Sequence, residues 1–211
     1  MTRIPKYWTK AKKYLSKKDK KMAKLIKIYQ SPSEIVLTSR RDIFFSLCKS
    51  IIGQQISVAA ANSVFLKFKK KCDYKISAKK VSKLSARQLK SCGLSRQKVL
   101  GIKSLAKQIL NKSFKPKLIS KMNDEDAISY LSNLRQIGTW SAEMILLFTY
   151  NRPNIWPIQD IGLLRAISKN YNKKYLPPLK FVNLLKKRFS PYCSVATWYL
   201  WRSIDPEPIQ Y

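Results

Sequence analysis

The chain has 211 residues, with 43 lysines and arginines against 11 acidic residues, so its formal net charge at pH 7 is +32. Hydrophobic residues make up 45% of the sequence, which is enough for a folded core, and no uncharged apolar run approaches the ~20 residues that a membrane-spanning helix needs. These values exclude an integral membrane protein and a typical disordered chain, and so basic a surface attracts polyanions, of which nucleic acid is the commonest in a cell.

Apolar residues recur at helical spacing along the chain, and no strong strand-like alternation is found. Serines at N-cap positions and prolines at helix starts support the same assignment. The predicted helices span residues 18–30, 41–68 with a break near Gly53, 77–83, 85–91, 95–110, 123–134, 140–150, 161–169, 177–188 and 191–203. The sequence therefore predicts an all-α fold.

The helix pair over 41–68 carries an apolar stripe that indicates its inward face. The members of this stripe are Ile43, Phe44, Leu47, Ile51, Ile56, Ala60, Val64 and Phe68. Residues 140–150 are almost all apolar, so we expect that helix to be buried on most sides. The Lys-rich start of the chain lacks the apolar run of a secretory signal.

Histidine is absent and the four cysteines are far apart, which removes several kinds of site. Without histidine there is no Ser–His or Cys–His pair and no His-ligated zinc. Cysteines 48, 72, 92 and 193 form no C-x-x-C pair, which argues against an iron–sulfur cluster or a zinc knuckle. We therefore expect buried or unpaired thiols in a cytoplasmic protein, associated with the nucleoid if the source is bacterial.

The most informative segment is residues 134–167, LRQIGTWSAEMILLFTYNRPNIWPIQDIGLLRAI. It predicts two helices joined by a tight turn, then an aromatic and Pro-bounded loop, and then a helix that begins at Asp160. The first amides of the helix after the turn have no partner within that helix, so with the helix dipole they can bind a phosphate without specifying a base. Gly138 in the turn has no Cβ, so a phosphate can approach its amide closely.

Few of the acidic residues are candidates for a catalytic carboxylate. Asp42, Glu143 and Asp160 lie in apolar surroundings, whereas Asp19, Asp73 and others lie in polar stretches. Glu143 lies on the helix predicted to be buried and fits a structural, hydrogen-bonding role. Asp160 fits a helix N-cap as well as a catalytic group, and the two roles can coexist.

Several segments together resemble one family of DNA repair enzymes. They are residues 134–167, IIGQQISVAAA at 51–61, GLSRQK at 93–98, PYCSVATWYLWRSID at 191–205 and the closing DPEPIQY. On these motifs, which cover residues 42–211, the chain resembles the 3-methyladenine DNA glycosylase II branch of the helix-hairpin-helix DNA glycosylase superfamily. The resemblance implies two helical subdomains, one over 43–150 with a hairpin at about 134–142 and one over 1–42 plus 151–211, with an active-site cleft between them.

The resemblance also implies roles for individual residues. Asp160, on the wall of the cleft, matches the catalytic Asp of the family. The base pocket is expected from Trp140, Tyr192, Met144 and Gln54, and DNA contacts are expected from Gln55, Gln136, Ile137, Gly138 and Thr139. Gln55 matches the residue that fills the gap left by a flipped base, and Gln136 stands where the family usually has glycine. No cofactor is required, but a structural Na⁺ or K⁺ is expected at the main-chain carbonyls of Ser132, Leu134 and Ile137.

The chemistry of glycosidic cleavage agrees with these roles. A base inside duplex DNA hides its glycosidic bond, so the enzyme must extrude the nucleotide. Cleavage builds positive charge on the deoxyribose, which a single carboxylate in a water-poor cleft can stabilise. An alkylated base is already cationic and can leave without a second, protonating carboxylate. Superfamily members that also cut the strand use a lysine where this chain has Trp140, so we expect no lyase activity.

The sequence therefore predicts a monomeric, monofunctional glycosylase of base-excision repair that acts on double-stranded DNA containing alkylated purines, with no membrane partner. The main alternative is a non-catalytic helix-hairpin-helix DNA-binding protein, which would need neither Asp160 in an apolar cleft nor an aromatic pocket. An RNA- or ribosome-associated protein would explain the charge but not the hairpin. Among enzymes, a glycosylase for oxidised or mismatched bases stays open.

Overall fold

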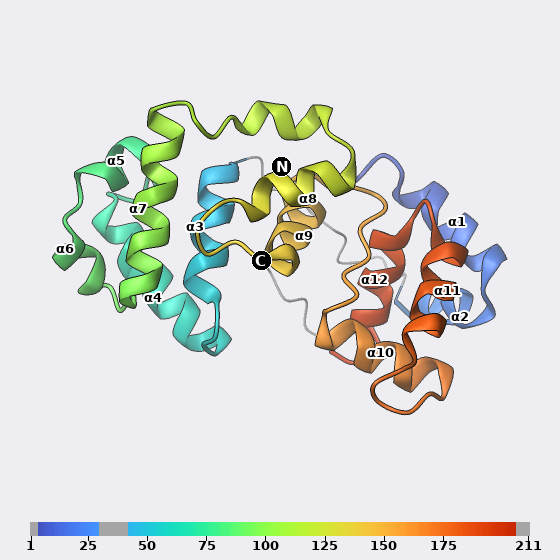
Figure 1. The fold of residues 1–211 in the computed structure, drawn as a ribbon. Helices are drawn as coiled ribbons and strands as arrows, with labels where there is room; N and C mark the ends of the chain where they lie inside the picture. The colour runs from blue at the N-terminus through green and yellow to red at the C-terminus, as the bar shows by residue number, and fades with distance from the viewer. Residues whose placement is uncertain (1–3, 30–41, 206–211) are drawn as a thin grey trace. The chain divides into compact units, whose positions relative to one another are not determined.

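The structure is a computed structural model that describes residues 4–29 and 42–205 (Figure 1). Within these ranges every regular element is a helix, which confirms the all-α prediction. The helices are α1 Trp8–Lys18, α2 Lys20–Tyr29, α3 Ile43–Gly53, α4 Val58–Lys71, α5 Ala78–Lys83, α6 Ala86–Lys90, α7 Arg96–Leu110, the 3₁₀ helix η1 Pro116–Lys121, α8 Asp124–Ser132, α9 Thr139–Phe148, α10 Ile161–Tyr171, α11 Leu179–Phe189 and α12 Cys193–Arg202. Residues 206–211 of the closing motif and the predicted helix ends at residues 30 and 41 lie outside the described residues.

Serine side chains begin four consecutive helices, and for α5, α6 and α7 they do so at the positions that the sequence indicates. Each accepts a backbone N–H of the first turn: Ser57 for α4, Ser77 for α5, Ser85 for α6 and Ser95 for α7. Such a cap is worth about 1 kcal/mol, because it satisfies an amide that has no partner within the helix. These caps explain why the helix starts in this part of the chain could be predicted closely.

Two elements were not expected from the sequence, and part of the predicted inner stripe is wrong. Helix α1 and the 3₁₀ helix η1 were missed. Ile56 and Ala60 are exposed, although they continue the apolar stripe of α3. The reason is the turn between α3 and α4, where Gln55 has a φ of 56° and breaks the helical register.

The chain divides into two compact units. The first combines α1 and α2 with the residues from Leu146 onward, and the second runs from the start of α3 to Ile145. In the first unit, α12 packs against α1, α2, α10 and α11, so the buried α12 forms its centre. In the second unit, α7 packs against α3, α5 and α6. The cleft expected between the two parts stays a prediction.

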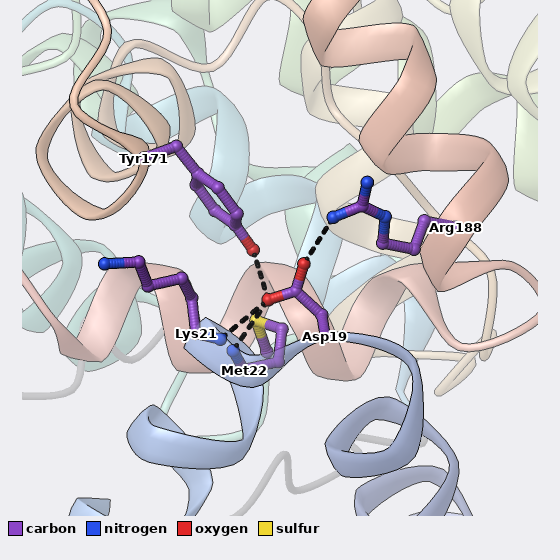
Figure 2. A network of polar contacts seen from close by, with 5 residues as sticks. All are labelled: Asp19, Lys21, Met22, Tyr171 and Arg188. Atoms are coloured by element: carbon purple, nitrogen blue, oxygen red, sulfur yellow. Dashed lines mark hydrogen bonds and ion pairs between the residues drawn. The ribbon is translucent and has the colours of Figure 1, made fainter.

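A buried carboxylate joins three segments of the first unit (Figure 2). Asp19, between α1 and α2, accepts hydrogen bonds from the amides of Lys21 and Met22 at 2.9 and 3.0 Å, which begins α2. It also accepts one from the Tyr171 hydroxyl at 3.0 Å, and it pairs with Arg188 of α11 at 2.7 Å. Asp19 is therefore buried, although its neighbours in the sequence are polar. Its carboxylate anchors the N-terminal helices to the ends of α10 and α11.

The four cysteines are buried and none of them forms a disulfide, as the sequence predicts. Burial raises the pKa of the Cys72 thiol to about 11 and holds that of Cys48 well above its usual value. Both thiols stay protonated at neutral pH, and a thiol in that form is unreactive. Across the described ranges, no helix has the length and apolar character to cross a membrane.

We expect Asp19→Ala to lower the free energy of unfolding by about 2–3 kcal/mol, because it removes a helix cap and leaves the guanidinium of Arg188 without its buried partner. This value is below that of a fully buried pair, because Arg188 is 38% exposed. Denaturant unfolding followed by circular dichroism measures it. The control is Asp73→Ala, which breaks a 2.9 Å pair with Lys80 in which Asp73 is 83% exposed. An equal loss in both variants would contradict the anchoring role of Asp19.

Candidate active site

Asp160 is a buried carboxylate at the start of α10, only 9% exposed. Its Oδ1 atom accepts the backbone N–H of Leu163 at 2.6 Å, which makes it the N-cap of the helix. The same oxygen accepts the indole N–H of Trp201 at 2.8 Å. Two donors on one oxygen hold the carboxylate in a single orientation, and its place at a helix N-terminus favours a negative charge.

Trp201 orients this carboxylate from α12, and its own ring is fixed by stacking on Phe148. The two rings are nearly parallel, with centroids 6.1 Å apart and 7° between their planes. Gly162 leaves the room that both partners need, since a Cβ there would lie 3.1 Å from Asp160 Oδ1 and 3.4 Å from the Trp201 ring. Sequence reasoning gave no role to Trp201, although it lies within the 191–205 motif.

Tyr192, expected in the base pocket, lies in an aromatic cluster of the same unit. Its ring stacks on Tyr7 with centroids 6.3 Å apart and meets Tyr14 edge-on at 5.4 Å. The Tyr7 hydroxyl donates to the Asn151 carbonyl at 2.8 Å, and that of Tyr14 to the Ser190 carbonyl at 2.7 Å. Burial raises the pKa of Tyr7 well above its usual value. Tyr7 and Tyr14 could not be found from the sequence because α1 was not predicted.

The hairpin between α8 and α9 lies in the second unit. Its turn is closed by a hydrogen bond from the Ile137 amide to the Leu134 carbonyl at 3.0 Å, and the Ile137 side chain is buried. Gln136 has a φ of 68°, the left-handed conformation that glycine adopts most readily. Gly138 and Thr139 are exposed, and the space where a Gly138 side chain would lie is open.

Gln54 and Gln55 form the turn between α3 and α4 of this unit. The side-chain amide of Gln54 donates to the Gln136 carbonyl at 2.7 Å and to Ser141 Oγ at 3.4 Å. The contacts of Gln54 thus hold this turn to the hairpin, and its part in a base pocket stays a prediction. Gln55 is exposed, and its left-handed backbone is uncommon for a residue with a side chain.

The other predicted site residues of the second unit lie on or beside α9. Trp140 is half-buried in the first turn of this helix, and Met144 is buried one turn further on.

Ser132 ends α8, whose last carbonyls have no partner within the helix and lie at its negative end. Hard carbonyl oxygens at that end suit a monovalent cation. The residues that the structure describes hold no group of three or more histidine, cysteine or acidic side chains that could bind a metal ion.

The remaining acidic candidates differ in their surroundings. Glu143 is buried on α9, as expected. Asp42 is exposed and caps α3 by accepting the Phe45 amide at 3.0 Å, so the expectation of apolar surroundings for it is wrong. Asp160 caps its helix and is also buried. Its role as a helix N-cap is therefore compatible with the catalytic role that the sequence leaves open.

Comparison with known proteins shows the family. The model of the HhH-GPD superfamily of base excision DNA repair proteins matches residues 48–191. The chain belongs to this superfamily. An alkylbase DNA glycosidase-like protein of Schizosaccharomyces pombe is 30% identical to this chain. The matched region covers 92% of this chain and 93% of that relative.

Two solved structures share the HhH-GPD fold of the chain. The 3-methyladenine DNA glycosylase of Schizosaccharomyces pombe in complex with abasic DNA has a TM-score of 0.78 at 23% identity, covering 92% of this chain and 96% of the other. A DNA-3-methyladenine glycosidase from Bacillus halodurans has a TM-score of 0.80 at 24% identity, covering 92% and 88%. The predicted site residues divide between the units, with Asp160 and Tyr192 in the first and the others in the second.

Gly101 of α7 makes room for Gln136 at the hairpin. A Cβ at Gly101 would lie 2.9 Å from Cγ and 3.2 Å from Cβ of Gln136. We expect Gly101→Ala to destabilise the wild-type chain, since overpacking costs about 1–3 kcal/mol. In a Gln136→Gly background the same change should stabilise by up to about 1 kcal/mol through helix propensity. Denaturant unfolding of the four proteins measures both effects, and the same sign in both backgrounds would contradict this packing.

Proposed function

We propose that the chain is a monofunctional DNA glycosylase that hydrolyses the N-glycosidic bond of alkylated purines, of the 3-methyladenine type, in base-excision repair. The observation that carries the proposal is the buried Asp160 carboxylate, oriented by the Leu163 amide and the Trp201 indole. The superfamily and the names of the relatives support the reaction and the substrate class.

In this mechanism Asp160 stabilises the positive charge that develops on the deoxyribose as the bond to the base breaks. A fixed negative charge acts more strongly in a site with little water, because the effective dielectric constant is low. The carboxylate also orients or deprotonates the water that attacks the sugar. Trp201 contributes by keeping Oδ1 in place, so that the carboxylate does not have to reorient during the reaction.

The second unit supplies the DNA contacts. The exposed Gly138 and Thr139 at the start of α9 offer backbone amides to a phosphate, and Gln55 fills the gap left by the extruded nucleotide. The partner is double-stranded DNA with alkylated bases. The protein binds it as a monomer in the cytoplasm, and no membrane takes part. The net charge of +32 adds affinity that falls steeply with salt.

The carbonyls of Ser132, Leu134 and Ile137 would hold a structural Na⁺ or K⁺ at the hairpin. The C-terminal end of α8 fits such an ion, because its carbonyls carry the negative end of the helix dipole. The ion would contribute positive charge near a bound phosphate, and no cofactor takes part in the chemistry.

We expect the wild-type chain to release methylated purines from duplex DNA, and Asp160→Asn to lower the single-turnover rate by at least about 100-fold. Asparagine caps a helix as well as aspartate does, so this variant should fold normally. Chromatography of the released bases measures the rate, and circular dichroism checks the fold.

The product identifies the reaction type. Trp140 stands where strand-cutting enzymes have a lysine that forms a Schiff base with the sugar. Without that lysine, the product DNA should contain an uncut abasic site, and borohydride should trap no protein–DNA crosslink. Equal release by the wild type and by Asp160→Asn would remove the carboxylate from the mechanism. No release by the wild type, together with tight DNA binding, would favour the non-catalytic DNA-binding protein.

A further inference from the structure

Lys98 holds the end of α3 from the neighbouring helix α7. Its Nζ atom donates to the carbonyls of Ile52 and Gln54, both at 2.8 Å. These carbonyls end α3 and have no partner within that helix, so a cation there satisfies them and complements the negative end of the helix dipole. Burial lowers the pKa of Lys98, as expected for an ammonium group that these contacts partly shield from water.

The same contacts reach the hairpin through Gln54. Lys98 fixes the Gln54 backbone, and the Gln54 side chain donates to the Gln136 carbonyl at 2.7 Å. One turn beyond Lys98 on α7, Gly101 accommodates the Gln136 side chain. The N-terminal half of α7 therefore contacts both turns, because Lys98 bonds the backbone beside Gln55 and Gly101 lies against Gln136 of the hairpin.

We propose that Lys98 is a positioning residue that sets the spacing between the Gln55 turn and the hairpin, and thereby the ability of the protein to extrude a nucleotide. This inference rests on the proposed function. Extrusion requires contacts that hold the phosphate and, at a fixed distance from the phosphate, a side chain that fills the gap in the base stack. A misplacement of about 1 Å can lower the rate of an enzymatic reaction by about 100-fold. A flexible Gln55 turn would still bind DNA but would fill the gap poorly.

The matched control is Lys103, on the same helix. Its Nζ atom makes the same kind of contact, with the carbonyls of Ser82 and Leu84 at 3.1 and 2.7 Å, but it supports the end of α5 instead of the two turns. Each of the variants Lys98→Met and Lys103→Met removes one charge and one two-carbonyl contact. A role of Lys98 in stability alone would make the two variants behave alike.

The experiment uses a duplex with a 2-aminopurine at the target position, whose fluorescence rises when the base leaves the stack. We expect Lys98→Met to lower the extruded fraction about tenfold or more, while the affinity for undamaged duplex falls less than twofold and Lys103→Met extrudes like the wild type. Lys98→Arg should restore part of the extrusion, because it keeps the charge and the donors. If Lys98→Met does not fold, Gln54→Leu tests the same connection, because it removes the hydrogen bond from Gln54 to the hairpin. This variant should also lose extrusion while its affinity for undamaged duplex changes little.

Equal extrusion by Lys98→Met and the wild type, or an equal loss in Lys103→Met, would overturn the inference. A wild-type protein that does not extrude 2-aminopurine would overturn it too. A wild-type protein that extrudes the base but never releases methylated purines would refute the proposed glycosylase activity alone, and the comparison of the two lysine variants would still decide the role of Lys98.

Discussion

The carboxylate of Asp160 depends on a helix terminus and an indole for its orientation, and the first unit is arranged to supply both. Helix α10 provides the Leu163 amide, and α12 provides Trp201, which Phe148 holds by stacking. The buried Asp19 network ties Tyr171, at the far end of α10, to α2 and α11. Both ends of α10 are thus fixed by buried carboxylates, which gives the proposed catalytic group a rigid base.

The second unit has a different physical task. Each of its two turns has a residue with a left-handed backbone conformation, Gln55 in one and Gln136 in the other. This conformation costs more free energy for glutamine than for glycine. The surrounding contacts compensate for this, because Gln54 links the turns, Lys98 holds the first of them and Gly101 makes room beside the second. The departure from glycine at position 136 therefore comes with a matching space on α7.

The sequence predicts most of the fold because its helices carry local signals. Serine caps and apolar periodicity locate α4 to α7, and the 134–167 segment locates both Asp160 and the hairpin. Helix α1 was missed because its apolar positions, Trp8, Ala11 and Leu15, are interleaved with many lysines. Periodicity fails at Ile56 because a left-handed residue precedes it, and no local pattern connects Asp19 with Arg188 across 169 positions.

The contacts of the candidate site were harder to predict than its residues. A motif can indicate Asp160, but the hydrogen bond from Trp201 joins residues 41 positions apart and depends on how α12 packs. The same holds for Gln54, whose bond to the hairpin spans 82 positions. Its position beside Gln55 was evident from the sequence, whereas its partner was not.

Binding to two abasic duplexes tests whether Asp160 stabilises a cationic sugar. One duplex carries a protonated pyrrolidine ring in place of the deoxyribose, and the other carries a neutral tetrahydrofuran ring. We expect the wild type to prefer the cationic duplex by about 100-fold or more, as for a transition-state analogue, and Asp160→Asn to lose this preference. An Asp160→Asn variant that keeps the full preference would contradict this role of Asp160.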